Sequence, residues 1–517
     1  MRAAHTVEVV RAAERALMAE LPDGTLMQRA AAGLAATCAR LLDHVYGSRV
    51  AVLAGSGDNG GDALYAGSRL AARGADVIAV AAGSQPHAGG AAALCGSGGR
   101  IIAAVGSPDL PAASDKDHPG PGGQPIEPPA ASAIAAADLI IDGLTGIGGH
   151  GGLREPAATL ARLAAAARQE GALLIAVDLP SGIDANSGEV TGTAIQADIT
   201  VTFGTIKPGL LVDPGASHTG TVELIDIGLG PYLAEPEVTA LQAADVAAIL
   251  PRPGAESDKY RRGVLGLLAG SEQYTGALVL ACGGAIHAGA GMVRAVSAAP
   301  AIAVVRQHWP EVVLTTYDPA GPAEAVTGAG RVQAWAAGPG MGTDATAHDL
   351  LARVLASDVP VLVDADGLTV LAAHRDLLPR AAPTLITPHA GELARLLRAD
   401  RADVEARRLH FARTAAAELG VTVLLKGSTT VIAGPDDGRP VLVNSTGSSW
   451  LATAGSGDVL SGLAGGLLAQ GADAAHAAAA AAYLHGIAAR LAARDAPIGA
   501  SDLIGAIPAA IRSVKDM

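Results

Sequence analysis

The chain has 517 residues, more than one hydrophobic core usually serves, so we expect at least two domains. Half of the residues are apolar and only 2% are aromatic, a composition typical of helices packed on parallel strands. The net charge of -14 argues against a nucleic-acid partner, because proteins that bind a phosphate backbone concentrate lysine and arginine. We therefore expect an α/β enzyme that acts on small molecules.

Three features bear on where the protein acts. The first residues lack a continuous apolar stretch, so no secretory signal is predicted and we expect a cytoplasmic protein. Residues 472–493 are rich in alanine, but charged residues, histidines and a glycine interrupt them, which favours a packed helix over a membrane span. Cys38, Cys95 and Cys282 lack the spacing of a disulfide framework or a zinc site, so we interpret them as small buried side chains.

Short β-branched runs alternate with helical runs through the first half of the chain. We predict a helix at 62–73 and strands at residues 49–54, 76–80, 139–141, 173–177 and 199–203. This alternation indicates βαβ units, hence a Rossmann-like parallel sheet with helices on both faces. Residues 106–132 are rich in proline, glycine, serine and charged residues, and we expect a mobile surface loop there.

A segment rich in glycine and proline, residues 228–236, follows the last of these strands and indicates a linker. The second half begins with a helix from Ala243 and alternates again, with strands predicted at 264–269, 361–363, 384–386 and 421–425. The halves share this rhythm but no motifs, so we interpret them as two different α/β domains and not as a repeat. We place the first domain at residues 1–228 and the second at residues 237–517.

A glycine-rich loop, Gly55–Asp62, directly follows the first predicted strand and opens a helix, the position of a phosphate loop in dinucleotide-binding proteins. Taken alone, the loop fits a tight turn capped by Asp62 equally well. Asp142 and Asp178 strengthen the case for a site, because both follow predicted strands and open parallel sheets bind ligands at that edge. A single acid in such a place would more often cap a turn.

Oxygen atoms at this edge of the sheet suit a hard cation. Asn59, Asp142 and Ser181 supply amide, carboxylate and hydroxyl oxygens, which leaves Asp178 free for proton transfer. Lys207 also follows a strand and can supply a positive charge, although a solvated lysine is the commoner outcome.

These motifs resemble the NAD(P)H-hydrate epimerase family. The resemblance rests on Leu26-Met27, the Gly55–Asp62 loop, and the segments Asp-x-Leu-x-Gly-x-Gly from Asp142 and Val-Asp-x-Pro-Ser-Gly around Asp178. It implies a potassium ion bound by Asn59, Asp142 and Ser181. It also implies that the hydrated nicotinamide nucleotide contacts Asp58, Asn59, Gly60, Gly61, Asp62, Gly146, Ile147, Gly148, Gly149, His150, Gly151, Gly152 and Asp178.

Two positions depart from that family. Asp58 stands where the family usually has a second asparagine, and Ala63 stands where it usually has glycine. Because Asp58 adds a negative charge beside an anionic substrate and Ala63 restricts close backbone approach, we expect weaker binding.

The most informative motif of the second half is a glycine-rich turn at Thr453–Asp458, which a helical run follows. Its backbone N–H groups and the helix N-terminus can hold a phosphate, and Asp458 can then take a proton from an attacking hydroxyl. Lys426–Thr430 follows a predicted strand and suits the phosphates and ribose of a nucleotide, with an edge turn as the plain alternative. His389 also follows a strand, where a ligand contact and an ordinary surface histidine have even odds.

Other polar residues of the second half have a plain structural interpretation. Asp364 and Asp366 end a predicted strand and can cap the helix that begins at Leu368. His476 and His485 lie within the alanine-rich helix, and we interpret both as structural.

The second half resembles the ADP/ATP-dependent NAD(P)H-hydrate dehydratases of the ribokinase-like group. Further stretches that carry this resemblance are Lys259, Tyr274–Ala277, Gly289–Val293, Gly338–Gly342 and Asn444–Gly447. The hydrate is then expected to contact Ala277, Gly340, Gly342, His389 and Asp458, and the nucleotide is expected to contact Lys426, Gly427, Ser428, Thr429, Thr430 and Gly457. Ala454 replaces a frequent glycine of the family, a change that we do not expect to abolish activity.

The order of the two domains is similar to that of the bifunctional nicotinamide nucleotide repair family. The resemblance implies that the first domain interconverts the (R) and (S) hydrates, with Asp178 as acid or base. It implies that Asp458 activates the hydroxyl of the (S) hydrate for attack on ADP with Mg²⁺, after which phosphate is eliminated and NAD(P)H, AMP and phosphate are the products. We expect small-molecule partners only, without nucleic acid or membrane, and a homo-oligomer.

Two rival interpretations stay open at this point. A ribokinase-like small-molecule kinase would release a stable phosphorylated alcohol. Alternatively, the first domain is a regulatory module that binds nucleotide without catalysis. The sequence does not decide between ADP and ATP, or between NADH and NADPH hydrates.

Overall fold

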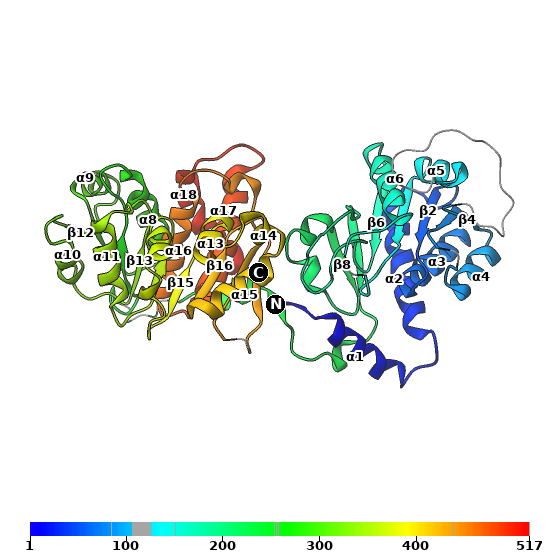
Figure 1. The fold of residues 1–517 in the computed structure, drawn as a ribbon, viewed down its shortest axis with the longest axis horizontal. Helices are drawn as coiled ribbons and strands as arrows, with labels where there is room; N and C mark the ends of the chain where they lie inside the picture. The colour runs from blue at the N-terminus through cyan, green and yellow to red at the C-terminus, as the bar shows by residue number, and fades with distance from the viewer. Residues whose placement is uncertain are drawn as a thin grey trace. The chain divides into compact units, whose positions relative to one another are not determined.

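The computed structural model describes residues 1–83, 85–105, 126–149, 151–252, 254, 256, 258–436 and 438–515. Two compact units divide the chain: Ala3–Glu237 forms the first, and Val238–Met517 with Met1–Arg2 forms the second (Figure 1). The short strand β1 (Arg2–Ala4) runs across this boundary in sequence. Within the second unit, the amino-terminal nitrogen of Met1 lies 2.7 Å from Asp245 Oδ2.

The segment expected to be a linker, residues 228–236, is folded against the first unit. It contains the 3-10 helix η3 (Gly230–Tyr232), and the Tyr232 hydroxyl donates a hydrogen bond of 2.8 Å to Glu20 Oε2. Leu229 is fully buried in the core of the first unit. The change of unit therefore comes at Glu237, after this segment.

The first unit is built on a seven-stranded parallel sheet in the order β4-β3-β2-β5-β6-β7-β8. The strands are β2 (Arg49–Ala54), β3 (Asp76–Ala81), β4 (Arg100–Ala103), β5 (Leu139–Gly143), β6 (Leu173–Val177), β7 (Ile199–Phe203) and β8 (Thr221–Ile225). All five strands predicted from sequence are present, because a parallel sheet buried on both faces requires continuous apolar runs. The prediction missed β4 and the edge strand β8.

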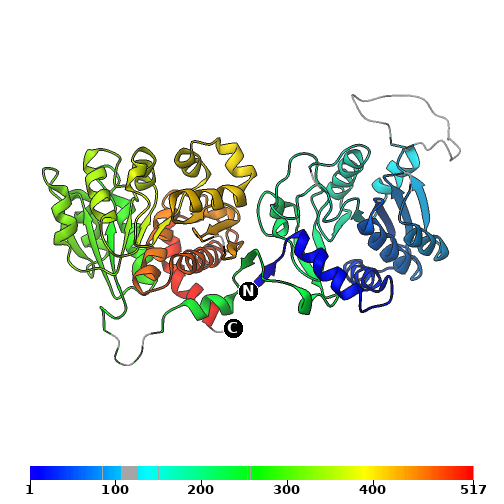
Figure 2. The ribbon, with the colours of Figure 1, turned by 60° about the horizontal axis from the view of Figure 1, so that its bottom comes forward.

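Side-chain alternation along these strands supplies two separate cores. Val50, Val52 and Ala54 of β2 pack with α2, α3 and α4, whereas Ala51 and Leu53 pack with α5 and α6 on the other face. The helices of the first unit are α1 (Val7–Met18), α2 (Thr25–Leu41), α3 (Asp58–Ala71), α4 (Ala88–Gly96), α5 (Pro128–Ala135) and α6 (Ala157–Gln169). The predicted arrangement, a Rossmann-like parallel sheet covered on both faces, is confirmed (Figure 2).

Three local expectations for the first unit need correction. The loop predicted at 106–132 falls mostly outside the described residues, but its last part is helix α5, because proline fits the first turn of a helix and the following residues are mainly alanine. Helix α3 begins at Asp58, not at Asp62. Cys38 and Cys282 are buried as expected, whereas Cys95 is exposed on α4.

The second unit has a larger, mixed sheet. Its strands run in the order β9-β18-β17-β16-β15-β14-β13-β10-β11-β12, and only the pairs β16–β17 and β17–β18 are antiparallel. The bounds are β9 (Val238–Ala240), β10 (Val264–Leu268), β11 (Met292–Ser297), β12 (Val313–Thr316), β13 (Ala334–Ala337), β14 (Val361–Val363), β15 (Thr384–Ile386), β16 (Thr422–Leu425), β17 (Thr430–Ala433) and β18 (Val441–Asn444).

Helices cover both faces of this sheet as well (Figures 1 and 2). One cluster of buried residues joins the sheet to α7 (Ala243–Ile249), α8 (Thr275–His287), α9 (Ala299–His308), α16 (Ser456–Ala469), α17 (Ala474–Ala493) and α18 (Ala500–Lys515). The remaining helices are α10 (Pro322–Gly328), α11 (Ala345–Leu355), α12 (Asp366–Ala373), α13 (Ala390–Leu397), α14 (Arg401–Ala406) and α15 (Arg408–Leu419). The alanine-rich segment is α17, a packed helix as predicted, and among the described residues no helix is long and apolar enough to cross a membrane.

Helices α8 and α16 touch backbone to backbone. A Cβ atom at Gly462 of α16 would lie 2.0 Å from the carbonyl oxygen of Ala281, and one at Gly284 of α8 would lie 2.3 Å from that of Val459. Only glycine allows such an approach. We call this contact the glycine seam, defined by Gly284 and Gly462.

Candidate active sites

The first candidate site lies where β2, β5 and β6 end. A cavity of about 580 Å³ opens at this edge of the sheet. It is lined by most of the residues expected from sequence, namely Asp58, Asn59, Asp62, Gly146, Ile147, Gly148, Gly149 and Asp178. Gly60 and Gly61 are buried in the first turn of α3, and Gly151 and Gly152 are not among the lining residues. His150 lies outside the described residues.

Close backbone contacts shape the loop that opens α3. A Cβ atom at Gly55 would lie 2.0 Å from the carbonyl oxygen of Leu144, and one at Gly60 would lie 2.2 Å from that of Gly55. The loop therefore packs against the end of β5, and the N-terminus of α3 points its N–H groups toward the cavity edge. An anion is stabilised in this position by the helix dipole.

Lys207 is the largest correction at this site, because its side chain is buried and not solvated. It is 1% exposed, and its ammonium group forms an ion pair with Asp178 and donates hydrogen bonds to Thr202 Oγ1 at 3.0 Å and the Phe203 carbonyl at 3.2 Å. Asp178 also accepts hydrogen bonds from the Thr202 hydroxyl and the Phe203 amide. Asp178 has φ +64°, a conformation that a non-glycine residue rarely adopts without a functional reason.

Asn59, Asp142 and Ser181 are joined by hydrogen bonds to one another or to Thr145. The fully buried Asp142 accepts hydrogen bonds from the Ser181 hydroxyl at 2.7 Å and the Ser181 amide at 2.9 Å. The side-chain amide of Asn59 donates to the carbonyl oxygen of Thr145 at 3.0 Å. Burial raises the pKa of Asp142 to about 6, while the hydrogen bonds from Ser181 oppose this shift. A buried carboxylate beside amide, hydroxyl and carbonyl oxygens fits a hard cation such as potassium.

Helix α1 forms one wall of the cavity, and this role of α1 was not predicted from the sequence. Arg11, Glu14, Arg15 and Met18 line it, and a Cβ atom at Gly148 would lie 3.1 Å from Arg11 Nη2. Burial and the negative charges of Asp178 and Asp58 raise the pKa of Glu14. The available signal was the Arg-Ala-Ala-Glu-Arg run, whose charges fall at the i, i+3, i+4 spacing of one helix face.

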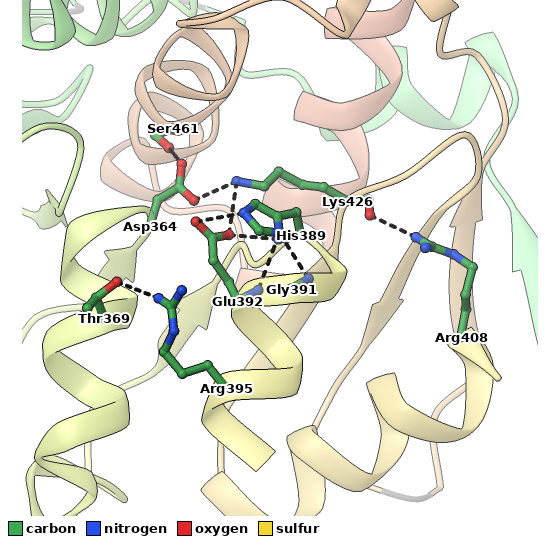
Figure 3. Close-up of polar contacts among 9 residues, drawn as sticks. All are labelled: Asp364, Thr369, His389, Gly391, Glu392, Arg395, Arg408, Lys426 and Ser461. Atoms are coloured by element: carbon green, nitrogen blue, oxygen red, sulfur yellow. Dashed lines mark hydrogen bonds and ion pairs between the residues drawn. The ribbon is translucent and has the colours of Figure 1, made fainter. Parts of the chain in front are cut away.

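The second candidate site centres on an ion pair that joins two strand ends (Figure 3). Lys426 Nζ lies 2.7 Å from Asp364 Oδ1 and 3.8 Å from Glu392 Oε2. The hydroxyl of Ser461 in α16 donates to Asp364 Oδ2 at 2.7 Å, and Asp364 is 1% exposed. The capping interpretation of Asp364 is therefore wrong. Asp366 instead accepts a hydrogen bond of 3.0 Å from the backbone amide of Gly342.

The glycine turn before α16 lies directly over this ion pair. Gly455 has φ +86°, and helix α16 begins at Ser456, so Asp458 belongs to the first helical turn and not to the turn before it. A Cβ atom at Gly457 would lie 3.6 Å from Lys426 Nζ. Burial raises the pKa of Asp458 to about 7, the charge of Asp364 adds to this shift, and Lys426 opposes it.

His389 caps helix α13. Its Nδ1 atom accepts hydrogen bonds from the amides of Gly391 at 3.0 Å and Glu392 at 3.3 Å, and Glu392 Oε2 accepts from the His389 amide at 2.8 Å. This reciprocal pair is a capping box. The His389 side chain is 57% exposed, so it is open to solvent, and its contact with a ligand stays a prediction.

The remaining residues expected at this site come from several neighbouring loops. A Cβ atom at Gly340, which has φ +61°, would lie 2.8 Å from the Ala277 Cβ in the first turn of α8, and Gly342 has φ +82°. Residues 426–430 form the turn between β16 and β17, which contains Lys426, Gly427, Ser428, Thr429 and Thr430.

The buried Arg408, which sequence reasoning missed, braces this turn. Its guanidinium donates to the carbonyl oxygens of Leu425 at 3.2 Å, Lys426 at 2.8 Å and Thr429 at 3.1 Å (Figure 3 draws the bond to Lys426). The turn is therefore held by a side chain from α15 and not by its own residues alone.

The two histidines of α17 have structural contacts, as predicted. His485 Nε2 donates a hydrogen bond of 3.0 Å to the carbonyl oxygen of Ser456. Burial lowers the pKa of His485 to about 4, so the ring is neutral and its one N–H makes this bond. His476 pairs with Asp473, the N-cap of the same helix. His485 thereby fixes the start of α16 next to Asp458.

Comparison with known proteins places this arrangement in a family. A family model described as NAD(P)H-hydrate dehydratase matches residues 265–509, and one described as YjeF-related protein N-terminus matches residues 23–209. The chain is 46% identical to the bifunctional NAD(P)H-hydrate repair enzyme Nnr of Mycobacterium leprae, over 99% of this chain and 100% of that protein. The chain belongs to the bifunctional NAD(P)H-hydrate repair enzymes. It is also 48% identical to the Mycobacterium tuberculosis enzyme of that name, over 93% of this chain and 92% of the relative.

A member of this bifunctional repair family carries an epimerase domain and an ADP-dependent dehydratase domain. The match to the YjeF-related N-terminus falls in the first unit, and the match to the dehydratase model falls in the second unit. The family and the fold class predicted from sequence are confirmed. Among solved structures, the chain is similar to the ADP/ATP-dependent NAD(P)H-hydrate dehydratase of Bacillus subtilis co-crystallized with ATP/Mg²⁺. The identity is 30%, with a TM-score of 0.48, over 53% of this chain and 97% of that chain.

Proposed function

We propose that the second unit dehydrates the (S) epimer of hydrated NADH or NADPH with ADP, and that Asp458 is its catalytic base. The observation that carries this assignment is the position of Asp458 in the first turn of α16, beside the Asp364–Lys426 ion pair. A carboxyl group whose pKa lies near 7 can accept a proton from a hydroxyl at neutral pH and release it afterwards.

The reaction follows from these groups. Asp458 takes the proton of the substrate hydroxyl while its oxygen attacks the terminal phosphoryl group of ADP, so AMP leaves. The phosphorylated oxygen then departs as phosphate, and loss of a proton from the neighbouring ring carbon restores the double bond of NAD(P)H. Lys426 and the N-terminus of α16 stabilise the transferring phosphoryl group, and Mg²⁺ supplies further charge neutralisation when bound.

The nucleotide and the hydrate contact different residues of the second unit. Residues 426–430 and Gly457 hold the nucleotide. The hydrate lies against Ala277, Gly340, Gly342 and His389, with its hydroxyl toward Asp458. This assignment is supported by the proximity of Gly457 to Lys426 and of Gly340 to Ala277.

The first unit interconverts the two epimers in the cavity bordered by α1 and α3. Asp178 acts there as acid or base, and the glycine loops after β2 and β5 hold the phosphates of the nucleotide. Asn59, Asp142 and Ser181 would hold potassium, which would neutralise the buried Asp142 and stabilise the loop that carries Thr145. A cytoplasmic location and a homo-oligomeric state stay predictions from sequence.

One assay with mixed epimers of NADH hydrate tests both assignments. NADH absorbance recovers completely if both units are active. It stops at the share of one epimer if the first unit only binds nucleotide. It does not recover at all if the second unit is a kinase that releases a stable phosphate ester.

A further inference from the structure

One oxygen of a second carboxyl group in the first unit's cavity lacks a hydrogen-bond partner among the described residues. Asp62 lines the cavity, and its buried Oδ1 atom has no partner among the residues that the structure describes. Burial raises the pKa of Asp62 well above that of an ordinary carboxyl group, and the charges of Asp178, Asp58 and Glu14 add to the shift. The shift is toward the protonated form, the form that can donate a proton to a molecule in the cavity.

Asp178, by contrast, has several hydrogen-bond partners. Its carboxylate pairs with the ammonium group of Lys207 and accepts hydrogen bonds from the Thr202 hydroxyl and the Phe203 amide. All three donors reach one oxygen, Asp178 Oδ1. The cavity thus contains two carboxyl groups in different surroundings, one with a buried oxygen that has no partner among the described residues and one bound by an ammonium, a hydroxyl and an amide.

The two groups are carried by segments that follow the strands on either side of β5. Asp62 comes from α3, which follows β2, and Asp178 follows β6, while β5 lies between β2 and β6 in the sheet. Gly146–Gly149 of that middle loop also lines the cavity. A substrate ring bound over this loop would lie between the two elements that carry the carboxyl groups.

We propose that Asp62 is a catalytic residue of the epimerase, working with Asp178 as a two-carboxyl pair on opposite faces of the substrate ring. This inference rests on the proposed assignment of Asp178. Asp62 donates its proton to the substrate hydroxyl, the C–O bond breaks, and the ring nitrogen supplies an electron pair to give an iminium ion and water. A water molecule then adds to the other face and gives its proton to Asp178.

These reaction steps leave Asp62 ionised and Asp178 protonated, which is the arrangement needed for the reverse conversion. The enzyme returns to its first state by running that reverse conversion or by exchanging protons with solvent. Epimerisation therefore replaces the hydroxyl oxygen with oxygen from water.

Single substitutions test the pair, because each carboxyl group alone can expel and restore the hydroxyl on its own face only. In H₂¹⁸O, Asp178→Asn is expected to exchange oxygen into one epimer without converting it, and Asp62→Asn is expected to do the same with the other epimer. Both variants lose about 100-fold or more in epimerisation turnover above the spontaneous rate. Mass spectrometry of the separated epimers measures exchange, and calorimetry of the full chain checks that the first unit is folded.

Glu8→Gln, on the exposed part of α1, is the matched control for removal of an acid. The proposal is overturned if Asp62→Asn epimerises within about threefold of the unchanged protein, or if the two variants exchange the same epimer. It is also overturned if the first unit is folded in both variants but neither variant exchanges. Absence of epimerisation in the unchanged protein would instead contradict the proposed function of the first unit.

Discussion

Lys426 Nζ lies 2.7 Å from Asp364 Oδ1, and this partly buried ion pair lies next to Gly457 of the segment that leads into Asp458. The pair has a direct consequence for catalysis. Asp364 keeps Lys426 at the mouth of the glycine turn, and its negative charge raises the pKa of Asp458. Since Asp458 works as a base only when ionised, dehydration should increase as the pH rises through about 7.

Asp364→Asn should move this rise in kcat/KM to lower pH, by roughly one unit, because the loss of a like charge lowers the pKa of Asp458. A pH-rate profile of dehydration measures the shift. Ser461→Ala is the matched control, since it removes a hydrogen bond to Asp364 but keeps the charge. An unmoved profile in Asp364→Asn would show that Asp364 does not set the basicity of Asp458.

Asp458→Asn should keep nucleotide binding and lose dehydration by about 100-fold to 10⁴-fold, because the amide preserves the shape but accepts no proton. Calorimetric titration with ADP and the recovery of NADH absorbance measure the two effects separately. Near-normal turnover in this variant contradicts the assignment of the base. At pH 8 the variant should also resist heat better, because a desolvated carboxylate with a raised pKa destabilises the fold once it is ionised.

Lys207→Met should destabilise the first unit by about 3–5 kcal/mol, because it leaves the charge of Asp178 without its partner in a buried position. Adding Asp178→Asn should recover most of that loss, since the uncompensated charge is then removed as well. Calorimetry of the full chain resolves the transition that Lys207→Met moves. Equal stabilities of the single and double variants would mean that the ion pair is not coupled.

Removal of potassium should slow epimerisation and leave dehydration unaffected. The ion is expected at Asp142, which belongs to the first unit and lies below its cavity. Activity of each unit in potassium, sodium and choline buffers measures the difference. Asp142→Asn should abolish the response to potassium, and an epimerase that works equally well in choline would remove the ion from the mechanism.

The fold was largely predictable because buried parallel strands carry an unbroken apolar pattern. β2, β6 and β7 were predicted at their observed bounds for that reason. The prediction missed β4, β8 and β12, which lie at sheet edges, β17 and β18, which pair antiparallel, and also β9 and β11. Polar residues interrupt the apolar run in β8 and β12, whereas β17 is short and its pairing is decided by tertiary contacts.

The glycine loops and the acids at strand ends were also predictable, since position after a strand is visible in the sequence. The partners of those acids were not. Asp364 and Lys426 are 62 residues apart, and Asp178 and Lys207 are 29 residues apart. No local pattern tells a buried, paired lysine from a solvated one. The α1 wall was missed for the same reason, because it reaches the cavity only in the folded chain.

The glycine seam joins the two helices that begin at the dehydratase site. Ala277 lies in the first turn of α8 and Asp458 in the first turn of α16, so the seam sets the spacing between the surface expected to hold the substrate and the base. An added methyl group at Gly462 or Gly284 would push these helices apart throughout their length. The distance between Ala277 and Asp458 therefore depends on a backbone-to-backbone contact of α8 and α16 that only glycine permits.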